Sequence, residues 1–327
     1  QKVEDENISL KFSESWGKEL SKKNGLTIME MFKGIEDSSI KALYIMGENP
    51  MVSDPDLDHV KNVLENADFL VVQDIFMTET AQLAHVVLPT YSFAEKDGTF
   101  TNTERRVQRV RKAVEAPGEA KEDWKIFTEI ASKMGYDLNY SSAEEIFNEI
   151  ATITPSYAGI NYKRIDEEGG LQWPCPNTGH KGTKFLHENQ FSRGKGLFHS
   201  IEYQPSAELP DDEYPYILST GRILQHFHTG SMTRRSEGLN QIAPECIVEI
   251  NPADAIKSNI NDSDKIKIIS RRGEIETKVK ITPKSPEGVL FIPFHYAEAA
   301  ANKLTNTALD PVAKIPEYKV CAVRLER

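Results

Sequence analysis

Three short, mostly apolar runs near the start of the chain predict buried β-strands. They are residues 41–46, 69–72 and 85–88, and such runs are typical of strands that are covered on both faces. Between the first two, residues 56–66 repeat apolar side chains at the spacing of one helical face. A shorter segment, 78–84, separates the second run from the third. The order β-α-β-α-β predicts a parallel, doubly wound sheet.

Residues 122–134 and 143–151 predict two further helices. Gly135 follows the first at the position that favours a left-handed C-cap. Ser141 or Ser142 is available as the N-cap of the second.

A turn-rich segment, residues 152–215, separates these elements from a region whose pattern predicts β-strands. Its closely spaced glycines and prolines predict an irregular connector, and its length favours one that packs against the rest of the molecule. The region after it predicts six strands, at residues 216–219, 247–250, 265–269, 274–281, 289–292 and 319–325. Six short strands suggest a closed barrel.

Two local signals predict connections within this second region. Arg271-Arg272-Gly273-Glu274 indicates a tight hairpin between its third and fourth strands. Asn251 and Pro252 predict the start of a short helix, with the asparagine as cap and the proline at the first helical position.

Composition restricts the class of protein. The chain has 327 residues, of which 39% are hydrophobic, enough for about two globular domains of ordinary size. Its formal net charge of −11 argues against binding to nucleic acid or to an anionic membrane surface. No apolar run approaches the roughly 18 residues of a membrane span, and the first residues lack the order of a secretory signal. We therefore expect a cytoplasmic protein.

The cysteines and the first residue add two expectations. The chain has three cysteines, Cys175, Cys246 and Cys321, which lie too far apart in sequence to form a CxxC pair. The sequence therefore contains neither a zinc-knuckle motif nor an iron–sulfur motif, and this use of cysteine is consistent with a reducing compartment. The chain starts at Gln1 without an initiator methionine, which suggests a processed or excised piece.

Polar residues follow the first two predicted strands, where an open parallel sheet binds its ligands. Gly47 and Asn49 follow the first strand, and Gln73 and Asp74 follow the second. The carboxylate of Asp74 can accept paired hydrogen bonds from a donor edge such as that of guanine. The alternative is that Asn49 and Asp74 only cap the helices that follow. The standard dinucleotide and nucleoside-triphosphate fingerprints are absent.

A second polar cluster occupies residues 95–106. It combines Lys96, a glycine bend, hydroxyl groups and a pair of arginines, a set that suits a diphosphate. The basic residues continue to Lys112, and they form either a strip that faces an anion or the solvated face of a strand.

A third cluster, residues 219–235, follows the first strand of the predicted barrel. A glycine and alternating polar and aromatic residues, among them His226 and His228, indicate a loop folded over a bound group. Two histidines at this spacing also suit a metal, but no further histidine or cysteine is close in sequence to complete a zinc site. For His226 the ordinary alternative is a loop histidine with protein partners.

The last cluster surrounds the final predicted strand. Phe294 and Tyr318 offer aromatic bodies for a flat heterocycle, and Asn302 and Lys319 offer polar groups for a pterin carbonyl or a phosphate. Taken alone, each of these residues is compatible with ordinary packing at the rim of a barrel.

Together and in this order, the four clusters resemble the C-terminal half of the molybdopterin-guanine-dinucleotide oxidoreductases of the dimethyl-sulfoxide-reductase family. The resemblance covers nearly the whole chain and is closest to formate dehydrogenase alpha subunits. The segments that carry it are Gly47-Glu48-Asn49, residues 71–78, Gln172-Trp173-Pro174-Cys175, Asp212-Glu213-Tyr214-Pro215, Ser231-Met232-Thr233, residues 316–319 and residues 321–324.

The resemblance implies an α/β plus β fold in three parts. A Rossmann-like parallel-sheet domain would occupy residues 1–151 and an irregular connector residues 152–210. A six-stranded double-psi-type β-barrel that binds the molybdopterin dinucleotide would occupy residues 211–327.

The resemblance also implies which residues bind the cofactor. The guanosine and diphosphate would be held by Gly47, Asn49, Gln73, Asp74, Lys96 and Asp123. The pterin and phosphate region would be enclosed by Thr220, Gly221, Arg222, Gln225, His226, His228, Thr229, Phe294, Asn302, Tyr318 and Lys319.

The implied cofactor is bis-molybdopterin guanine dinucleotide with Mo or W, and the implied reaction is the oxidation of formate to carbon dioxide. In the family, the metal ligand and the 4Fe-4S cluster belong to an upstream half. The resemblance therefore implies no catalytic and no metal-binding residue in this chain, which alone should be inactive. That upstream half and electron-transfer subunits are the implied partners. A nitrate reductase-type relative and a non-catalytic cofactor-binding module are the alternatives.

Overall fold

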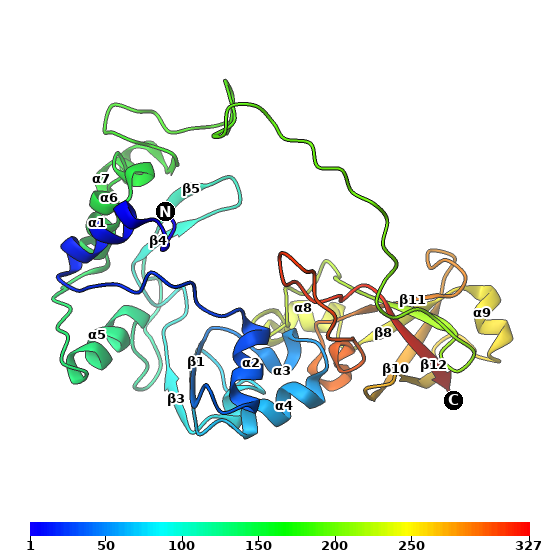
Figure 1. The fold of residues 1–327 in the computed structure, drawn as a ribbon. Helices are drawn as coiled ribbons and strands as arrows, with labels where there is room; N and C mark the ends of the chain where they lie inside the picture. The colour runs from blue at the N-terminus through cyan, green and yellow to red at the C-terminus, as the bar shows by residue number, and fades with distance from the viewer. The chain divides into compact units, whose positions relative to one another are not determined.

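A computed structural model describes residues 1–327, and its contacts divide the chain into two compact units. The first unit contains Gln1–Gly25 and Pro89–Ile201, and the second contains Leu26–Leu88 and Glu202–Arg327. Each unit is thus built from two stretches of chain, which the colours of Figure 1 follow from blue to red. The predicted domain at residues 1–151 thus has residues in both units. The three predicted domain ranges stay a prediction.

The second unit begins with a three-stranded sheet. Its strands are β1 (Ala42–Met46), β2 (Phe69–Asp74) and β3 (Val86–Pro89), in that order across the sheet. β1 and β2 are parallel, with Met46 opposite Gln73 at their carboxyl ends. The predicted strands and the parallel arrangement of the first two are confirmed.

Three helices accompany this sheet: α2 (Ile28–Glu36), α3 (Pro50–Ser53) and α4 (Leu57–Glu65). α4 confirms the helix predicted at residues 56–66. Its apolar face packs with α2 and the sheet in one core, whose fully buried members are Val60, Leu64, Leu70 and Val72.

The helix predicted at residues 78–84 is wrong. The structure has only a single 3-10 turn there, η1 (Ala81–Leu83). The hydroxyl of Thr78 accepts the backbone N–H of Ala81 at 3.2 Å, and the hydroxyl of Thr80 donates to Asn49 Oδ1 at 2.7 Å. Side-chain bonds of this kind compete with helical ones, and the segment is too short to offset the cost of helix nucleation.

The rest of the second unit forms the predicted six-stranded closed barrel, in the order β10-β8-β11-β7-β12-β9. β7 and β11 are parallel, as are β8 and β10, and the other four pairs are antiparallel. The strands are β7 (Tyr216–Gly221), β8 (Ile247–Ile250), β9 (Lys265–Ile269), β10 (Glu274–Ile281), β11 (Val289–Pro293) and β12 (Cys321–Glu326).

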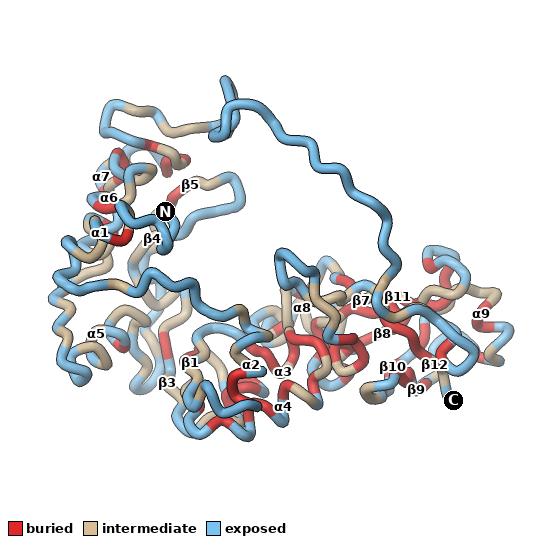
Figure 2. The backbone as a smooth tube through the Cα atoms, in the orientation of Figure 1, coloured by how far each residue is buried: buried red, intermediate tan, exposed pale blue.

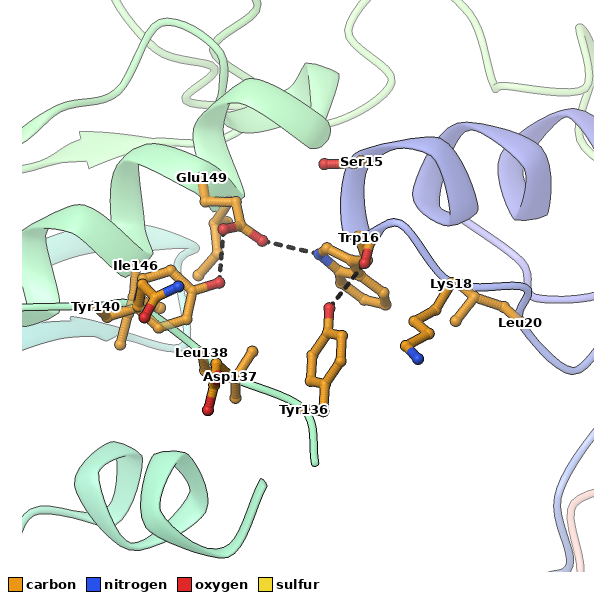
Figure 3. A pocket seen from close by; sticks show the side chains of 12 residues that line it. Ser15, Trp16, Lys18, Leu20, Tyr136, Asp137, Leu138, Tyr140, Ile146 and Glu149 are labelled. Carbon is orange, nitrogen blue, oxygen red and sulfur yellow. Dashed lines mark hydrogen bonds between the residues drawn. The ribbon is translucent and has the colours of Figure 1, made fainter. Parts of the chain in front are cut away.

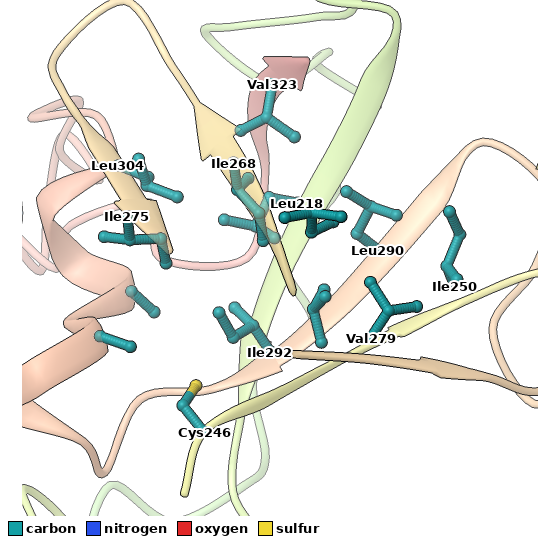
Figure 4. Close-up of a cluster of buried hydrophobic side chains, with 14 of the residues drawn as sticks. Leu218, Cys246, Ile250, Ile268, Ile275, Val279, Leu290, Ile292, Leu304 and Val323 are labelled. Carbon is teal, nitrogen blue, oxygen red and sulfur yellow. The ribbon is translucent and has the colours of Figure 1, made fainter. Parts of the chain in front are cut away.

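The barrel closes around a continuous apolar core. Leu218, Ile250, Leu290 and Val323 are fully buried within it, and Figure 4 shows these side chains converging from four strands. Figure 2 shows the same burial as red backbone along β7, β8 and β11. Because alternate side chains of each strand point inward, the barrel forms a rigid support for the loops at its rim.

Short helices and turns complete this unit. The hairpin predicted at 271–274 joins β9 to β10, with Ser270 N–H donating to Gly273 O at 2.9 Å. Asn251 caps α9 (Pro252–Lys257) as predicted. The others are η3 (Thr233–Arg235), α8 (Glu237–Ile242), η4 (Ala297–Ala299) and η5 (Ala301–Lys303).

The first unit contains four α-helices, α1 (Glu6–Trp16), α5 (Asp123–Lys133), α6 (Ala143–Ile153) and α7 (Tyr162–Glu168). α5 and α6 confirm the two predicted helices. Gly135 adopts the left-handed conformation that was predicted for it, and Ser142 is the N-cap of α6.

A small sheet of this unit was not predicted. Its order is β4-β5-β6, and both pairs are antiparallel. The strands are β4 (Gly98–Thr101), β5 (Arg106–Val110) and β6 (Leu171–Gln172).

The start of the predicted irregular connector is regular. α7, a 3-10 turn η2 (Pro155–Tyr157) and β6 lie within residues 152–172. They are ordered because Ile160, Tyr162 and Leu171 are buried against Val107 and Phe147, partners that lie earlier in the chain. Farther on, Figure 2 shows a long, mostly exposed segment that leads to the barrel.

No helix of the structure combines the length and the apolar character that a bilayer crossing requires.

Candidate functional site

Two parallel strands of the barrel bring separate polar clusters to one rim. Gly221 at the end of β7 lies opposite Pro293 at the end of β11, and the N–H of Phe294 donates to Gly221 O at 3.2 Å. A Cβ at Gly221 would lie 2.1 Å from the Phe291 ring, so any other residue here would have to displace that ring. The loops after the two strands therefore start side by side.

The segment that precedes β12 is tied to the same rim. Lys319 Nζ donates to Thr220 O at 2.5 Å, and the hydroxyl of Thr220 donates to Tyr318 O at 2.8 Å. Burial raises the pKa of Tyr318, and the Asp54 carboxylate adds to this increase. The phenol therefore stays protonated throughout the neutral range.

Buried His295 holds the loop after β7 in place. Its Nε2 accepts the backbone N–H of Ile223 at 3.0 Å, and its Nδ1 bonds His228 O. Because Nε2 accepts, the ring is neutral with its proton on Nδ1. Burial lowers the pKa of His295, which keeps the ring in this state. His228 itself adopts a left-handed conformation, φ 49°.

A cavity of about 490 Å³ opens at this rim. Arg222 and Lys319 contribute positive charge to it. The Arg222 guanidinium lies 5.7 Å from the centroid of the Phe294 ring, and the His228 ring meets that ring edge-on at 5.8 Å. The lining residues are Glu48, Ser53, Asp54, Thr220, Arg222, His228, Phe294, Asn302, Tyr318 and Lys319.

Asn302 joins the barrel to the end of α3 at this cavity. Its Nδ2 donates to Val52 O and to Ser53 O, both at 2.9 Å. Asn302 is 3% exposed, and its Oδ1 has no hydrogen-bond partner. A buried carbonyl oxygen without a partner costs free energy, so this atom is suited to accept from a ligand.

The predicted residues at the first strand end have protein partners. Asn49 Oδ1 accepts from the Thr80 N–H and hydroxyl at 3.2 and 2.7 Å, and its Nδ2 donates to Glu79 at 2.7 Å. Its side chain makes no capping bond to α3. Gly47 adopts φ 62° with no atom within 4 Å of the position a Cβ would take, so its backbone is open to close approach.

Gln73 and Asp74 at the second strand end are both buried. The hydroxyl of Tyr44 donates to Gln73 Oε1. Asp74 Oδ1 accepts the N–H of Phe76 at 2.9 Å, and burial raises the pKa of Asp74. The Arg235 guanidinium lies 4.1 Å from the Phe76 ring centroid, so a residue of the barrel loop adjoins this strand end.

Lys96 and Asp123 belong to the first unit and pair with each other. Lys96 Nζ lies 2.5 Å from Asp123 Oδ2, and the hydroxyl of Thr90 donates to Asp123 Oδ1 at 2.7 Å. Both side chains are about three-quarters buried, which makes this pair a defined local feature rather than a chance surface contact.

Gln225, His226 and Thr229 do not line the cavity. His226 Nε2 lies 2.8 Å from Ala243 O, and its Nδ1 lies 3.3 Å from the Thr233 hydroxyl. This is the arrangement of a loop histidine with protein partners, the alternative that the sequence left open. The Thr229 hydroxyl pairs with that of Ser231 at 2.8 Å. The cofactor roles of these three residues stay a prediction.

The basic run that ends at Lys112 lies along β5 and is paired with acidic side chains. Arg109 lies 3.3 Å and Arg111 2.6 Å from Asp166, and Lys112 lies 2.5 Å from Glu115. The pairing counts against a strip that faces an anion. The Arg109 side chain is only 14% exposed, so a solvated strand face does not describe this residue either.

A second cavity, of about 850 Å³, lies within the first unit. Figure 3 shows its polar centre, where the Glu149 carboxylate accepts from Trp16 Nε1 and from the Tyr140 hydroxyl. None of the predicted cofactor residues lines it. The rim cavity is therefore the better candidate site, although the other is larger.

Sequence reasoning missed Ser53 and Asp54 and used Glu48 only as part of a motif. All three line the rim cavity. Asp54 stands before Pro55 at the end of α3 and gives no periodic signal in the sequence. The cavity that it lines is shared with barrel residues such as Thr220 and Tyr318, which lie far along the chain.

Two family profiles match the chain. The family described as "Molybdopterin oxidoreductase" matches residues 6–133. The family described as "Molydopterin dinucleotide binding domain" matches residues 216–322, a range that runs from the start of β7 to the first two residues of β12.

Curated relatives match the chain along its whole length. F420-dependent formate dehydrogenase subunit alpha of Methanocaldococcus jannaschii is 56% identical over 100% of this chain and 49% of the relative. F420-dependent formate dehydrogenase 1 subunit alpha of Methanococcus maripaludis is 50% identical over 97% and 47%. The assimilatory nitrate reductase catalytic subunit of Bacillus subtilis is 39% identical over 99% and 47%. The chain spans about half the length of these relatives.

A solved structure is similar in fold. Acetylene hydratase from Pelobacter acetylenicus matches with a TM-score of 0.69 and 18% sequence identity, over 98% of this chain and 49% of that one. The predicted fold class, α/β plus a six-stranded barrel, is confirmed by the strand topology. With both family profiles matched, the chain belongs to the molybdopterin oxidoreductase family and carries its dinucleotide-binding domain.

Proposed function

We propose that this chain is the part of a formate dehydrogenase alpha subunit that binds and orients molybdopterin guanine dinucleotide. The observation that carries the proposal is the rim cavity, where Arg222 and Lys319 lie beside the Phe294 and His228 rings. A flat heterocycle with phosphate groups requires this combination of aromatic surface and positive charge. The relatives named as formate dehydrogenases support the choice of substrate.

The residues present fit such a group. Two residues that line the cavity, Asp54 and Asn302, each have a buried side-chain oxygen, Oδ2 and Oδ1, without a partner in the protein. The open backbone at Gly47 lies next to Glu48, another lining residue. A ligand with several N–H donors would satisfy these groups.

The chain's own residues act by positioning. Asn49, Gln73 and Asp74 would hold the guanosine, with the buried Asp74 carboxylate accepting from the guanine N–H edge. Lys96 and Asp123 would hold the diphosphate region. Lys319 and the loop at residues 220–229, held by His295, would enclose the pterin and exclude water from it. When bound, the cofactor accepts the two electrons that formate loses as it becomes carbon dioxide and a proton.

The finer parts of the proposal concern the whole enzyme. We infer a bis-molybdopterin guanine dinucleotide with Mo or W, and an upstream half that supplies the metal ligand and a 4Fe-4S cluster. Electron-transfer subunits would accept the electrons, and the compartment would be the cytoplasm. This chain alone would not oxidise formate, because it contributes no residue to the metal.

A chimera tests the function. This chain replaces the matching half of the Methanocaldococcus jannaschii subunit, and formate-dependent dye reduction, metal and released guanine nucleotide are measured. We expect an active chimera with bound cofactor and no formate oxidation by this chain alone. A folded chimera without guanine nucleotide would contradict the proposal.

A nitrate reductase role is the second candidate, because the Bacillus subtilis catalytic subunit is 39% identical over 99% of this chain. The same chain joined to the other half of that enzyme tests it. Nitrate reduction there, with no formate oxidation in the first chimera, would favour this alternative. Cofactor binding without either activity would favour a non-catalytic binding module.

A further inference from the structure

Asp54 is a buried carboxylate with an unused oxygen. It is 7% exposed and lies directly after α3. Its Oδ1 accepts the Ser53 hydroxyl at 3.0 Å, whereas its Oδ2 has no hydrogen-bond partner. An unpaired, buried acceptor in a native structure requires an explanation, and a missing ligand is one.

No cation is among the groups that shift the pKa of this carboxylate. Those groups are Ser53 and the acidic Glu48, and Lys319, which lines the same cavity, donates to Thr220 O at 2.5 Å. Burial raises the pKa of Asp54 to about 6, with Glu48 adding to the increase. The carboxylate is therefore largely ionised at pH 7, and its Oδ2 lacks a donor.

Asn302, which lines the same cavity, has a second unused acceptor. Its two Nδ2 hydrogens are committed to Val52 O and Ser53 O, both at 2.9 Å. This identifies the other amide atom as the oxygen, because an inverted amide would face two carbonyl oxygens with its own. The Asn302 side chain thus lies against the residue that precedes Asp54, and its Oδ1 has no partner.

We propose that Asp54 and Asn302 together bind the N–H edge of a 2-amino-4-oxopyrimidine ring, the ring that pterin and guanine share. This ring presents a ring N–H and an exocyclic amino group side by side, which match the two carboxylate oxygens, and the second amino hydrogen is available to Asn302 Oδ1. The inference rests on the proposed function, because it names how that cofactor is recognised. It adds Asp54 as a residue that selects the ring by its amino group.

Binding of pterin, GMP and lumazine to this chain at pH 7 tests the proposal by calorimetry. Lumazine has a carbonyl oxygen in place of the 2-amino group of pterin, so its oxygen would face the carboxylate. The variants are Asp54→Asn, which converts one acceptor oxygen into a donor, and Asp68→Asn. Asp68 is an exposed control of equal charge change in the same unit.

We expect pterin or GMP to bind the parent chain and lumazine to bind at least tenfold more weakly. Asp54→Asn should weaken binding of that ligand at least tenfold, and Asp68→Asn should weaken it by less than twofold. If Asp54→Asn weakens the binding of pterin, the ring whose N–H edge Asp54 binds is the pterin. If it weakens the binding of GMP, that ring is the guanine.

The proposal is overturned if neither pterin nor GMP binds the parent, if lumazine binds equally well, or if Asp54→Asn binds like the parent. The chimera described above separates this result from the proposed function. An active chimera whose cofactor content is unchanged by Asp54→Asn rejects only the role of Asp54. A parent chimera without cofactor rejects the function itself.

Discussion

An ionised Asp54 destabilises the folded chain, because burial removes water from its carboxylate and no cation replaces it. The pKa rises from its ordinary value to about 6. Since the folded-state pKa lies above that of the unfolded chain, the folded state binds this proton more tightly. The stability linked to this group is therefore present below about pH 4 and is lost as the pH rises to about 6.

Asp54→Asn should consequently stabilise the chain at high pH only. We expect the free energy of unfolding at pH 8 to rise by about 3 kcal/mol, and to be nearly unchanged at pH 4. Urea denaturation at both pH values measures this. The other titratable groups of the cavity, Glu48, Arg222, His228, Tyr318 and Lys319, are common to both chains. An equal gain at both pH values would exclude titration of Asp54 as the cause.

His295 should contribute to stability through the loop it holds. His295→Ala leaves the N–H of Ile223 and the carbonyl of His228 without their partner. We expect a loss of about 2–4 kcal/mol in urea denaturation. His187→Ala, at an exposed position, should stay within about 0.5 kcal/mol of the parent. Equal stability of both variants would mean that the loop finds other partners.

Residues of the site were predictable where they lie at or near an end of a predicted strand and also belong to one of the clusters that resemble the family. Phe294, Tyr318 and Lys319 follow or precede barrel strands, and the strand ends place them at one rim. Asp54 was not predictable, because residues that line the cavity with it, such as Thr220 and Tyr318, lie far along the chain.

At the level of elements, the sequence predicted those whose apolar pattern is complete within one segment. α4, α5 and all six barrel strands are of this kind. β6 has only two residues, and its strand pairing is with β5, far earlier in the chain. No window of sequence around β6 contains its partner, so its hydrogen bonds were not predictable from local pattern.

The contact between β7 and β11 should depend on a single glycine. Gly221→Ala places a Cβ 2.1 Å from the Phe291 ring, which must move and disturb the rim. We expect a loss of about 1–3 kcal/mol in urea denaturation. Gly238→Ala in α8 is the control, because no atom lies within 4 Å of the added group, and it should raise stability by about 0.5–1 kcal/mol. A tolerated Gly221→Ala would show that the ring has room to move.

At the scale of the whole molecule, the second unit is assembled from two distant stretches of chain. Contacts that join them include Asn302 to Val52 and Ser53, Lys303 to Asp58 at 3.7 Å, and Arg235 over Phe76 at 4.1 Å. The chain that links the stretches includes Arg193 and Lys195, in a fully exposed part of the segment before the barrel.

Limited digestion with trypsin should therefore cut first near Arg193 and Lys195, because an exposed segment without regular structure fits the protease best. We expect the two fragments to elute together in size-exclusion chromatography and to separate only in urea, since the second unit needs both. Asn302→Ala should lower the urea concentration at which they separate. Fragments of the parent chain that separate without urea would mean that contacts across residues 26–88 and 202–327 are too weak to hold the site together.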